Sequence, residues 1–334
     1  MEVGHGENGE NSMFSVSILH ASVVLKQTSH VKFGKLPDIS NVTFLLPTDP
    51  EDNTSTFSNL PQNNTPPKIF IGCTGWSMKE WVGKVYPTKT PTKNYLKEYA
   101  KQFNTIELNT THYRIPTLST IEKWKNESTP DFKFCPKIPQ TISHRSDLAA
   151  GNDQLERFCE SILGLEEKLG CCFMQLPPYF GMDRLGLLEH FFKRFPSNIR
   201  LAVELRHESI FSSKKNQKEV FDLLKKYNIA WVNTDVAGRR DVLHMHVSTD
   251  IAMIRFVGNG LHPTDYERIN KWVQRLKHWS LQGLSEIYFF PHEPDNILSP
   301  DLSLYLTEEL QKAFEVDTRG PQFFEDDGQQ MSLF

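Results

Sequence analysis

Polar and charged side chains are concentrated at the end of one short extended segment, within residues 103–116, FNTIELNTTHYRIP. Ile106 and Leu108 alternate with polar residues, and this period of two is typical of a β-strand. The polar residues that follow are Asn109, His112, Tyr113 and Arg114. Because α/β folds place their chemistry at the carboxyl ends of strands, this concentration predicts a functional site. An ordinary strand end with capping and turn residues is the alternative.

Two glutamates could serve as an acid and a base. Glu107 lies in this strand and Glu204 near the end of another predicted strand, so we expect them to face each other across one site. A carboxyl group with a raised pKa beside an ionised carboxylate forms an acid–base pair. With His207, they are the candidate catalytic residues. Ion pairing with an arginine is the alternative for both glutamates; the possible partners are Arg114, Arg206 and Arg255.

The other polar residues near predicted strand ends would suit an anionic ligand. Cationic and hydrogen-bonding side chains together bind phosphate, phosphodiester or carboxylate groups. The candidate substrate-binding residues are Trp76, Asn109, Tyr113, Arg114, Lys137, His144, Gln175, Arg206, Asp235 and Arg255.

Cofactor motifs are weak in this sequence. The histidines and glutamates could bind a divalent metal, but neither HExxH nor a similar His spacing is present, so we favour structural or hydrogen-bonding histidines. The metal ligands, and any cofactor, are left unassigned. The first predicted strand lacks GxGxxG, so nucleotide binding of that kind has no support.

Eight apolar segments have the length and composition of strands, and helical periodicity fills most of the intervals between them. The predicted strands are 68–75, 104–109, 132–138, 171–177, 199–206, 229–235, 251–258 and 286–292. The predicted helices are 91–102, 117–127, 153–168, 183–194, 216–227, 264–279 and 299–315. This alternation predicts an α/β fold, specifically a parallel (β/α)₈ TIM barrel. A doubly wound open sheet is the alternative.

Composition restricts the class of protein. The 334 residues are 38% hydrophobic and 23% charged, with a formal net charge of −4 and a pI near 6.3. A broad basic surface for nucleic acid is therefore absent, although a local basic cleft remains open. Five cysteines without a CxxC pair indicate reduced thiols, and we expect a cytoplasmic protein. No apolar run is long enough to cross a membrane.

The chain divides into three parts. Residues 1–66 are polar and predict an extended or disordered arm, and one alternative is that residues 1–30 do not belong to the working protein. Residues 67–315 carry the predicted barrel. Residues 316–334 predict a flexible acidic tail that ends in an apolar motif.

Six motifs in order resemble the YecE-like family, the domain of unknown function 72. They are GCTGW (72–76), residues 103–116, FKFCPKIPQTISH (132–144), MQLPP (174–178), RLAVELRHES (200–209) and IRFVG (254–258). The resemblance implies a TIM barrel with its site at the strand ends, while the activity of the family is not established. This chain has Cys73 where the family commonly has Thr. It also has Pro291, His292 and Glu293 where the family commonly ends its last strand with a pair of Asn.

The last five residues resemble the peptide by which bacterial DNA polymerases and repair proteins dock on the sliding clamp, usually Gln-Leu-Ser/Asp-Leu-Phe. The matching residues are Gln330, Met331, Leu333 and Phe334. A chance match, or packing of this end on the barrel, is the alternative.

Two hypotheses of function follow. The first is a hydrolase, lyase or isomerase acting on a phosphorylated sugar or a nucleic acid, linked to DNA metabolism if the clamp peptide is genuine. The second is a non-catalytic module that binds an anionic ligand or nucleic acid.

Overall fold

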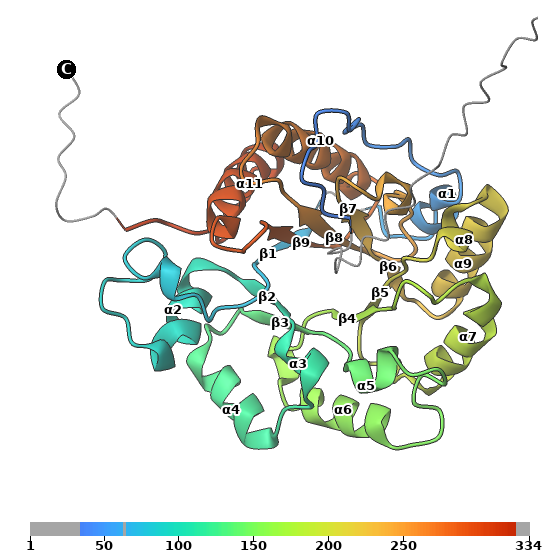
Figure 1. The fold of residues 1–334 in the computed structure, drawn as a ribbon, viewed down its shortest axis with the longest axis horizontal. Coiled ribbons are helices and arrows are strands. Elements are labelled where there is room, and N and C mark those ends of the chain that lie inside the picture. The colour runs from blue at the N-terminus through green and yellow to red at the C-terminus, as the bar shows by residue number, and fades with distance from the viewer. Residues whose placement is uncertain (1–33, 63–64, 325–334) are drawn as a thin grey trace, which may run out of the picture. The chain divides into compact units, whose positions relative to one another are not determined.

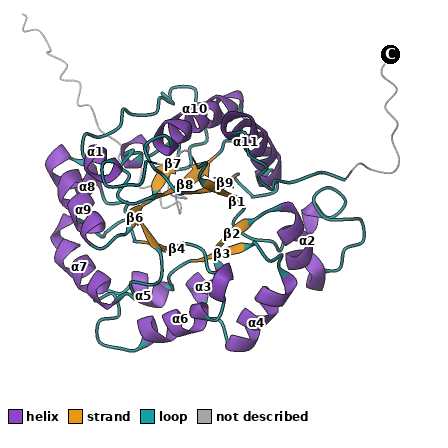
Figure 2. Cartoon of the chain, turned by 180° about the vertical axis from the view of Figure 1, so that it is seen from behind, coloured by secondary structure: helices purple, strands orange, loops and turns teal. Residues whose placement is uncertain are grey.

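Every strand pair in the described part of the chain is parallel, and helices surround the strands (Figures 1 and 2). The computed structural model describes residues 34–62 and 65–324. In this part of the chain the strands form three sheets. Their orders are β1 (Lys68–Ile71), β9 (Glu286–His292), β8 (Ile251–Val257), β7 (Asn233–Asp235); then β2 (Thr105–Leu108), β3 (Lys133–Pro136); then β4 (Cys172–Gln175), β5 (Leu201–Glu204), β6 (Ala230–Trp231).

A few backbone hydrogen bonds connect neighbouring sheets. Glu107 N donates to Cys73 O at 3.1 Å, just past the end of β1, and Ile138 N donates to Phe173 O at 2.8 Å, between the end of β3 and β4. The predicted strand 229–235 is divided into β6 and β7 at Val232, whose N–H bonds Val203 O at 3.0 Å. The chain changes partner there, because β6 pairs with β5 whereas β7 pairs with β8. The α/β class with parallel sheets is therefore confirmed.

Long helices follow the strands as the sequence predicts. They are α2 (Tyr95–Gln102), α4 (Leu118–Glu127), α6 (Gln154–Leu163), α7 (Leu185–Arg194), α9 (Lys214–Lys226), α10 (Pro263–Ser280) and α11 (Ser299–Phe314). α10 shows why such a segment is helical: Pro263 opens it, His262 and Asp265 form a capping box, and buried side chains recur at helical spacing. Short helices follow three strand ends, namely α3 (Thr110–Tyr113), α5 (Gln140–Ser143) and α8 (Glu208–Phe211).

The alternation of side chains along each strand separates two kinds of core. In β8, Ala252, Ile254 and Phe256 pack with residues of α10 and α11. Ile251 and Met253 face the other way, into an inner cluster that holds residues from most of the strands. The inner cluster comprises Phe70, Cys135, Cys171, Phe173, Ala202, Ala230, Val232, Ile251, Met253, Tyr288 and Phe290. Since successive side chains point to opposite faces, a residue two positions past a member of this cluster faces the same interior.

The described part of the N-terminal arm is anchored to the rest of the protein. It is irregular apart from α1 (Asn53–Phe57). The Asn53 side chain donates to Met245 O at 2.9 Å and accepts from Val247 N at 2.8 Å. Both partners lie in the irregular segment between β7 and β8, and Asn53 bonds their backbone as a neighbouring strand would. Asp49 binds Arg275 at 2.5 Å and Trp279 Nε1 at 3.0 Å on α10. Residues 34–62 are thus held to the rest of the protein by buried and partly buried polar contacts.

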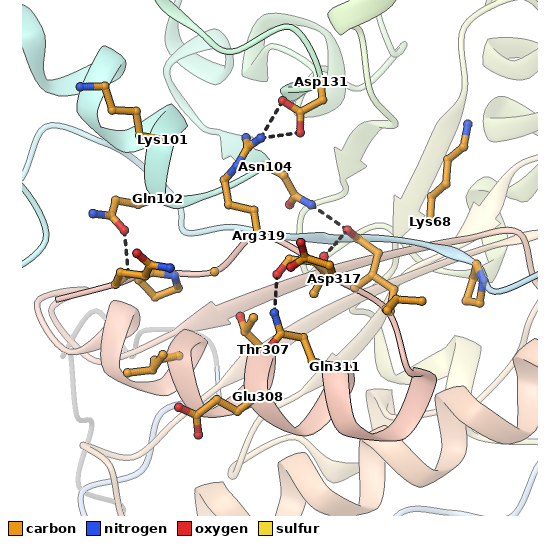
Figure 3. A pocket seen from close by; sticks show the side chains of 18 residues that line it. Lys68, Lys101, Gln102, Asn104, Asp131, Thr307, Glu308, Gln311, Asp317 and Arg319 are labelled. Atoms are coloured by element: carbon orange, nitrogen blue, oxygen red, sulfur yellow. Dashed lines mark hydrogen bonds and ion pairs between the residues drawn. The ribbon is translucent and has the colours of Figure 1, made fainter.

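Residues 316–324 correct the prediction of a tail that is flexible from residue 316 onward. Thr318 Oγ1 donates to Ile69 O at 3.1 Å, and Arg319 binds Asp131 at 2.6 Å and donates to Ala100 O at 3.1 Å. A cavity of about 800 Å³ lies beside this segment, near the amino ends of β1 and β2, and Figure 3 shows Arg319 reaching Asp131 there. The clamp-like residues Gln330, Met331, Leu333 and Phe334 lie outside the described residues. None of the described helices combines the length and the apolar character needed to span a membrane.

Candidate functional site

A polar layer caps the inner cluster at the carboxyl ends of the strands. The inner residues Cys135, Phe173, Ala202, Met253 and Phe290 are each followed, two positions later, by a polar residue. These polar residues are Lys137, Gln175, Glu204, Arg255 and His292. Glu107 joins them from β2, where it is fully buried. Strand periodicity therefore places residues from six strand segments in one site.

Arg255 is the centre of this layer. Its Nε and Nη2 donate to the two carboxylate oxygens of Glu107 at 2.8 and 2.9 Å, and its Nη1 donates to Glu204 Oε2 at 2.5 Å. Glu107 and Glu204 are 0% and 1% exposed, and Arg255 is 8% exposed. The guanidinium thus joins two buried carboxylates from separate sheets, and the bidentate geometry is the strongest form of this ion pair.

Further donors complete the coordination of both carboxylates. Glu107 Oε1 accepts from Asn109 Nδ2 at 2.9 Å, and Glu107 Oε2 lies 3.0 Å from His292 Nε2. Glu204 accepts from Arg206 Nε at 2.5 Å and from Gln175 Nε2 at 3.0 Å. The oxygen of the Gln175 amide in turn accepts from Lys137 Nζ at 3.0 Å. A continuous polar chain therefore connects Lys137 to Arg255.

These contacts correct the proposed acid–base role of the two glutamates. Burial alone would raise the pKa of Glu107, but Arg255 and His292 outweigh it and hold the pKa well below its usual range. Burial would also raise the pKa of Glu204, but Arg206 and Arg255 outweigh it and lower this pKa to about 2. Both carboxylates are therefore ionised at neutral pH, and neither has the raised pKa that a general acid requires. Ion pairing, the alternative left open by the sequence, describes them.

The pKa of the Lys137 amine, in this layer, lies closer to neutral pH than that of an ordinary lysine. Burial, helped by the positive charge of Arg255, lowers the pKa of the Lys137 amine to about 8, against the opposing effect of Glu107 and Glu204. His112 lies beside it, on α3: its ring is 5.2 Å from that of His144, and its Nδ1 is 3.1 Å from Ile138 O. Burial and the charge of Lys137 lower the pKa of His112 to about 4, so this imidazole is neutral.

Several predicted site residues do not join the polar layer. His207 accepts from Ser209 N at 3.1 Å and caps α8, so its position after β5 is explained by the start of a helix. Trp76 packs edge-to-face on Trp124, with their rings 5.9 Å apart. His144 is exposed, and Tyr113 and Arg114 are exposed at the end of α3. The predicted residues that do assemble are Glu107, Asn109, Lys137, Gln175, Glu204, Arg206 and Arg255.

Asp235 is a clear misassignment. Its carboxylate is fully buried and accepts from Arg268 Nη2 and Trp272 Nε1 of α10, both at 2.8 Å, and from Arg240. Ala230 and Val232 belong to the inner cluster, so the alternation places Thr234 inside and Asp235 outside. Asp235 therefore ties β7 to α10 rather than facing a substrate.

Two residues at the end of β9 were not among the candidate catalytic or substrate-binding residues. His292 contacts Glu107, and the signal that could have found it is its position two residues after the inner Phe290. Glu293 points away from this layer and accepts from Gly260 N at 2.7 Å. Burial raises the pKa of Glu293 to about 7, although that backbone hydrogen bond opposes the effect.

Neither a metal-binding group among the described residues nor either of two cavities of the protein coincides with this site. Within residues 34–62 and 65–324, no group of three or more His, Cys, Asp or Glu side chains is arranged to hold a metal ion. The cavity beside the tail contains none of the predicted site residues, and neither does one of about 780 Å³ between residues 47–52 and the start of α9. The candidate site is therefore defined by its side chains and not by either of these cavities.

Comparisons with known proteins find a matching family model and related sequences. The family model described as "Protein of unknown function DUF72" matches residues 70–323. The UPF0759 protein YecE of Escherichia coli K12 is 30% identical over 262 residues, which cover 73% of this chain and 93% of that protein. The UPF0759 protein YunF of Bacillus subtilis is 28% identical over 151 residues, covering 43% of this chain and 52% of that protein.

The same family is found among experimental structures. A crystal structure of a DUF72 family protein from Enterococcus faecalis V583 superposes with a TM-score of 0.58 at 19% identity, covering 76% of this chain and all of that one. That likeness concerns the fold. The family match extends from β1 through β9 and includes every residue of the polar layer, and the resemblance expected from the six motifs is confirmed: the chain belongs to the DUF72 family of proteins of unknown function.

Proposed function

We propose that this protein binds a small anionic ligand, carrying a phosphate or carboxylate group, at the carboxyl ends of its strands. The observation that carries the proposal is the charge of the polar layer. Three cationic side chains, Lys137, Arg206 and Arg255, accompany two carboxylates whose oxygens already accept from arginine. An anion near Lys137, Arg206 and Arg255 would be stabilised by the positive charge of these three side chains.

The arrangement of the strands supports the same location. We infer that the three sheets together form the wall of an eight-stranded barrel in which β6 and β7 count as one strand. Backbone hydrogen bonds between the sheets and the shared inner cluster support this inference. In such barrels the carboxyl ends of the strands carry the site in essentially every characterised enzyme.

A small ligand fits the electrostatics better than a nucleic acid. The formal net charge of −4 provides no broad basic surface to follow a phosphate backbone. The arginines of the layer are mostly buried, with Arg255 and Arg206 side chains 10% and 15% exposed. Because these arginines are enclosed, a single anionic group can contact them more readily than a row of phosphates can.

Arg206→Gln is expected to weaken binding of a phosphorylated sugar by about 10–100-fold, the usual effect of losing one charge-assisted hydrogen bond. Isothermal titration calorimetry with ribose 5-phosphate measures it, with ribose as the uncharged comparison and a single-stranded oligonucleotide as the nucleic-acid arm. Arg157→Gln, the same change at an exposed position on α6, is the matched control. Equal affinity of the wild type and Arg206→Gln, or no binding of ribose 5-phosphate by the wild type, would contradict the proposal.

We also propose that the C-terminal pentapeptide, residues 330–334, docks on a bacterial sliding clamp. The support is the sequence match together with the anchoring of residues 316–324, which leaves ten residues after Phe324. Leu333 and Phe334 would fill an apolar pocket of the clamp, as short peptides do when they fold on binding. This partner would link the protein to DNA metabolism without a basic surface of its own.

The double variant Leu333→Ala/Phe334→Ala is expected to lose binding to the purified clamp, because it removes both apolar anchors. Fluorescence anisotropy of the labelled full-length protein measures the affinity. Gln329→Ala, immediately before the pentapeptide, serves as the control and is expected to bind normally. The proposal fails if the intact protein does not bind, or if the double variant binds equally well.

A further inference from the structure

Lys137 is held in a position that suits a reactive amine. Its side chain lies at the end of β3, is 7% exposed and has its Nζ 5.4 Å from the centre of the Phe173 ring. Its hydrogen bond goes to the neutral oxygen of Gln175 at 3.0 Å. Among the described residues, no carboxylate forms an ion pair with it, although Glu107 and Glu204 belong to the same layer.

The reason is that other donors already occupy both carboxylates. Arg255, Asn109 and His292 contact the two oxygens of Glu107. Arg206, Arg255 and Gln175 donate to those of Glu204. The lysine is therefore left with an uncharged acceptor, which stabilises its ammonium form much less than a carboxylate would.

The orientation of the Gln175 amide follows from its two partners. Its nitrogen faces the Glu204 carboxylate and its oxygen faces Lys137, so each contact joins a donor to an acceptor. The flipped amide would set oxygen against oxygen and nitrogen against nitrogen. Glu204 thus fixes Gln175, and Gln175 positions the amine.

Burial keeps part of Lys137 unprotonated at neutral pH, and the charges that face its amine act in opposite directions, the arginines lowering its pKa and the glutamates raising it. These charges are Arg255, Arg206, Glu107 and Glu204, with the imidazoles of His112 and His144 close by. Burial and Arg255 lower its pKa to about 8. Near pH 7 about a tenth of the amine is then free, roughly 10²-fold more than for an ordinary lysine. A free amine held among cations is the arrangement of lysines that attack carbonyl groups.

We propose that Lys137 is a nucleophile that forms an imine with an aldehyde or ketone whose anionic group is held by Arg206 and Arg255. This rests on the proposed anion site and names the class of its substrate. The Nζ lone pair attacks the carbonyl carbon, forming a C–N bond. The carbonyl oxygen takes up two protons, one from the amine and one from the solvent, and leaves as water when the second C–N bond forms, so that the imine nitrogen keeps one proton. The resulting iminium can withdraw electrons from the neighbouring carbon, as lyase and isomerase chemistry on such substrates requires.

The test is reductive trapping of the full-length protein with glyoxylate and sodium cyanoborohydride, followed by peptide mass spectrometry. We expect Lys137 to gain one carboxymethyl group at least about tenfold faster near pH 7 than the exposed Lys193, because far more of its amine is free. Since only the neutral amine attacks, the fraction able to react falls as the pH drops below about 8. Glycolaldehyde, which lacks the carboxylate, is expected to react more slowly at this position.

Two lysine variants separate this site from general surface labelling. Lys137→Arg keeps a positive charge but has no free amine, so the fast adduct is expected to disappear. Lys133→Arg, on the same strand but in contact with Glu167 O instead, is the matched control and is expected to keep it. Labelling of Lys137 no faster than that of Lys193, or a fast adduct that persists in Lys137→Arg, would overturn the inference.

A parallel titration with inorganic phosphate distinguishes this inference from the proposed function. If phosphate binds the wild type and slows the labelling of Lys137, both are supported. If phosphate binds but Lys137 is not trapped preferentially, the imine inference is wrong while the anion site stands. If phosphate does not bind, the anion site itself fails.

Discussion

Replacing Arg255 by methionine is expected to lower the free energy of unfolding by about 3–5 kcal/mol. The change leaves Glu107 without its bidentate partner and Glu204 with one arginine fewer, and both carboxylates are almost fully buried. A buried charge that loses its partner cannot regain the hydration it gave up on folding. Urea unfolding followed by circular dichroism measures the difference.

A second variant tests whether this loss comes from the unpaired charges. Glu107→Gln/Glu204→Gln/Arg255→Met removes all three charges at once and is expected to be more stable than Arg255→Met alone, because neutral amides cost less to bury. Arg157→Met, at an exposed position, is expected to change the free energy of unfolding by less than about 0.5 kcal/mol. If Arg255→Met unfolds at the same midpoint concentration of urea as the wild type, the ion pairs of Arg255 do not stabilise the fold.

Asp235→Asn is expected to cost about 3 kcal/mol of stability, the second largest effect we anticipate. Asp235 accepts from Arg268 and Trp272 of α10 and pairs with Arg240, and it is fully buried. Asparagine keeps the shape but removes the negative charge, so Arg268, itself 0% exposed, loses one of its counter-ions. Thermal unfolding of the purified variant is the measurement.

Asp241→Asn provides the comparison for that experiment. Asp241 forms a surface ion pair with Arg239 on the same loop, and such pairs contribute at most about 1 kcal/mol. Had Asp235 been a substrate-binding residue, its replacement would weaken ligand affinity and leave stability nearly unchanged. That outcome would contradict the conclusion that Asp235 stabilises the fold by linking β7 to α10.

Much of the fold and part of the site could be predicted because the signals are local. Apolar segments with a period of two mark the strands, and capping residues with helical spacing mark the helices between them. The same period of two puts Lys137, Gln175, Glu204 and Arg255 on the face of the inner cluster. Asp235 and His207 were misassigned because nearness to a strand end was used without the alternation of faces.

What each charged group does was decided only by the tertiary structure. Glu107 and Arg255 are 148 residues apart in sequence, and Glu204 and Arg255 are 51 apart, so no local pattern shows that one guanidinium binds both carboxylates. The sequence by itself determined the parallel α/β class, the helices and the face on which the polar residues lie. The tertiary structure decided that the glutamates are ion-pair partners and that Lys137 is left with a neutral acceptor. It also decided that the arm and the first part of the tail are anchored. The physical reason is that the pKa and the role of a buried group depend on burial and on charges brought together from distant segments, which local sequence does not encode.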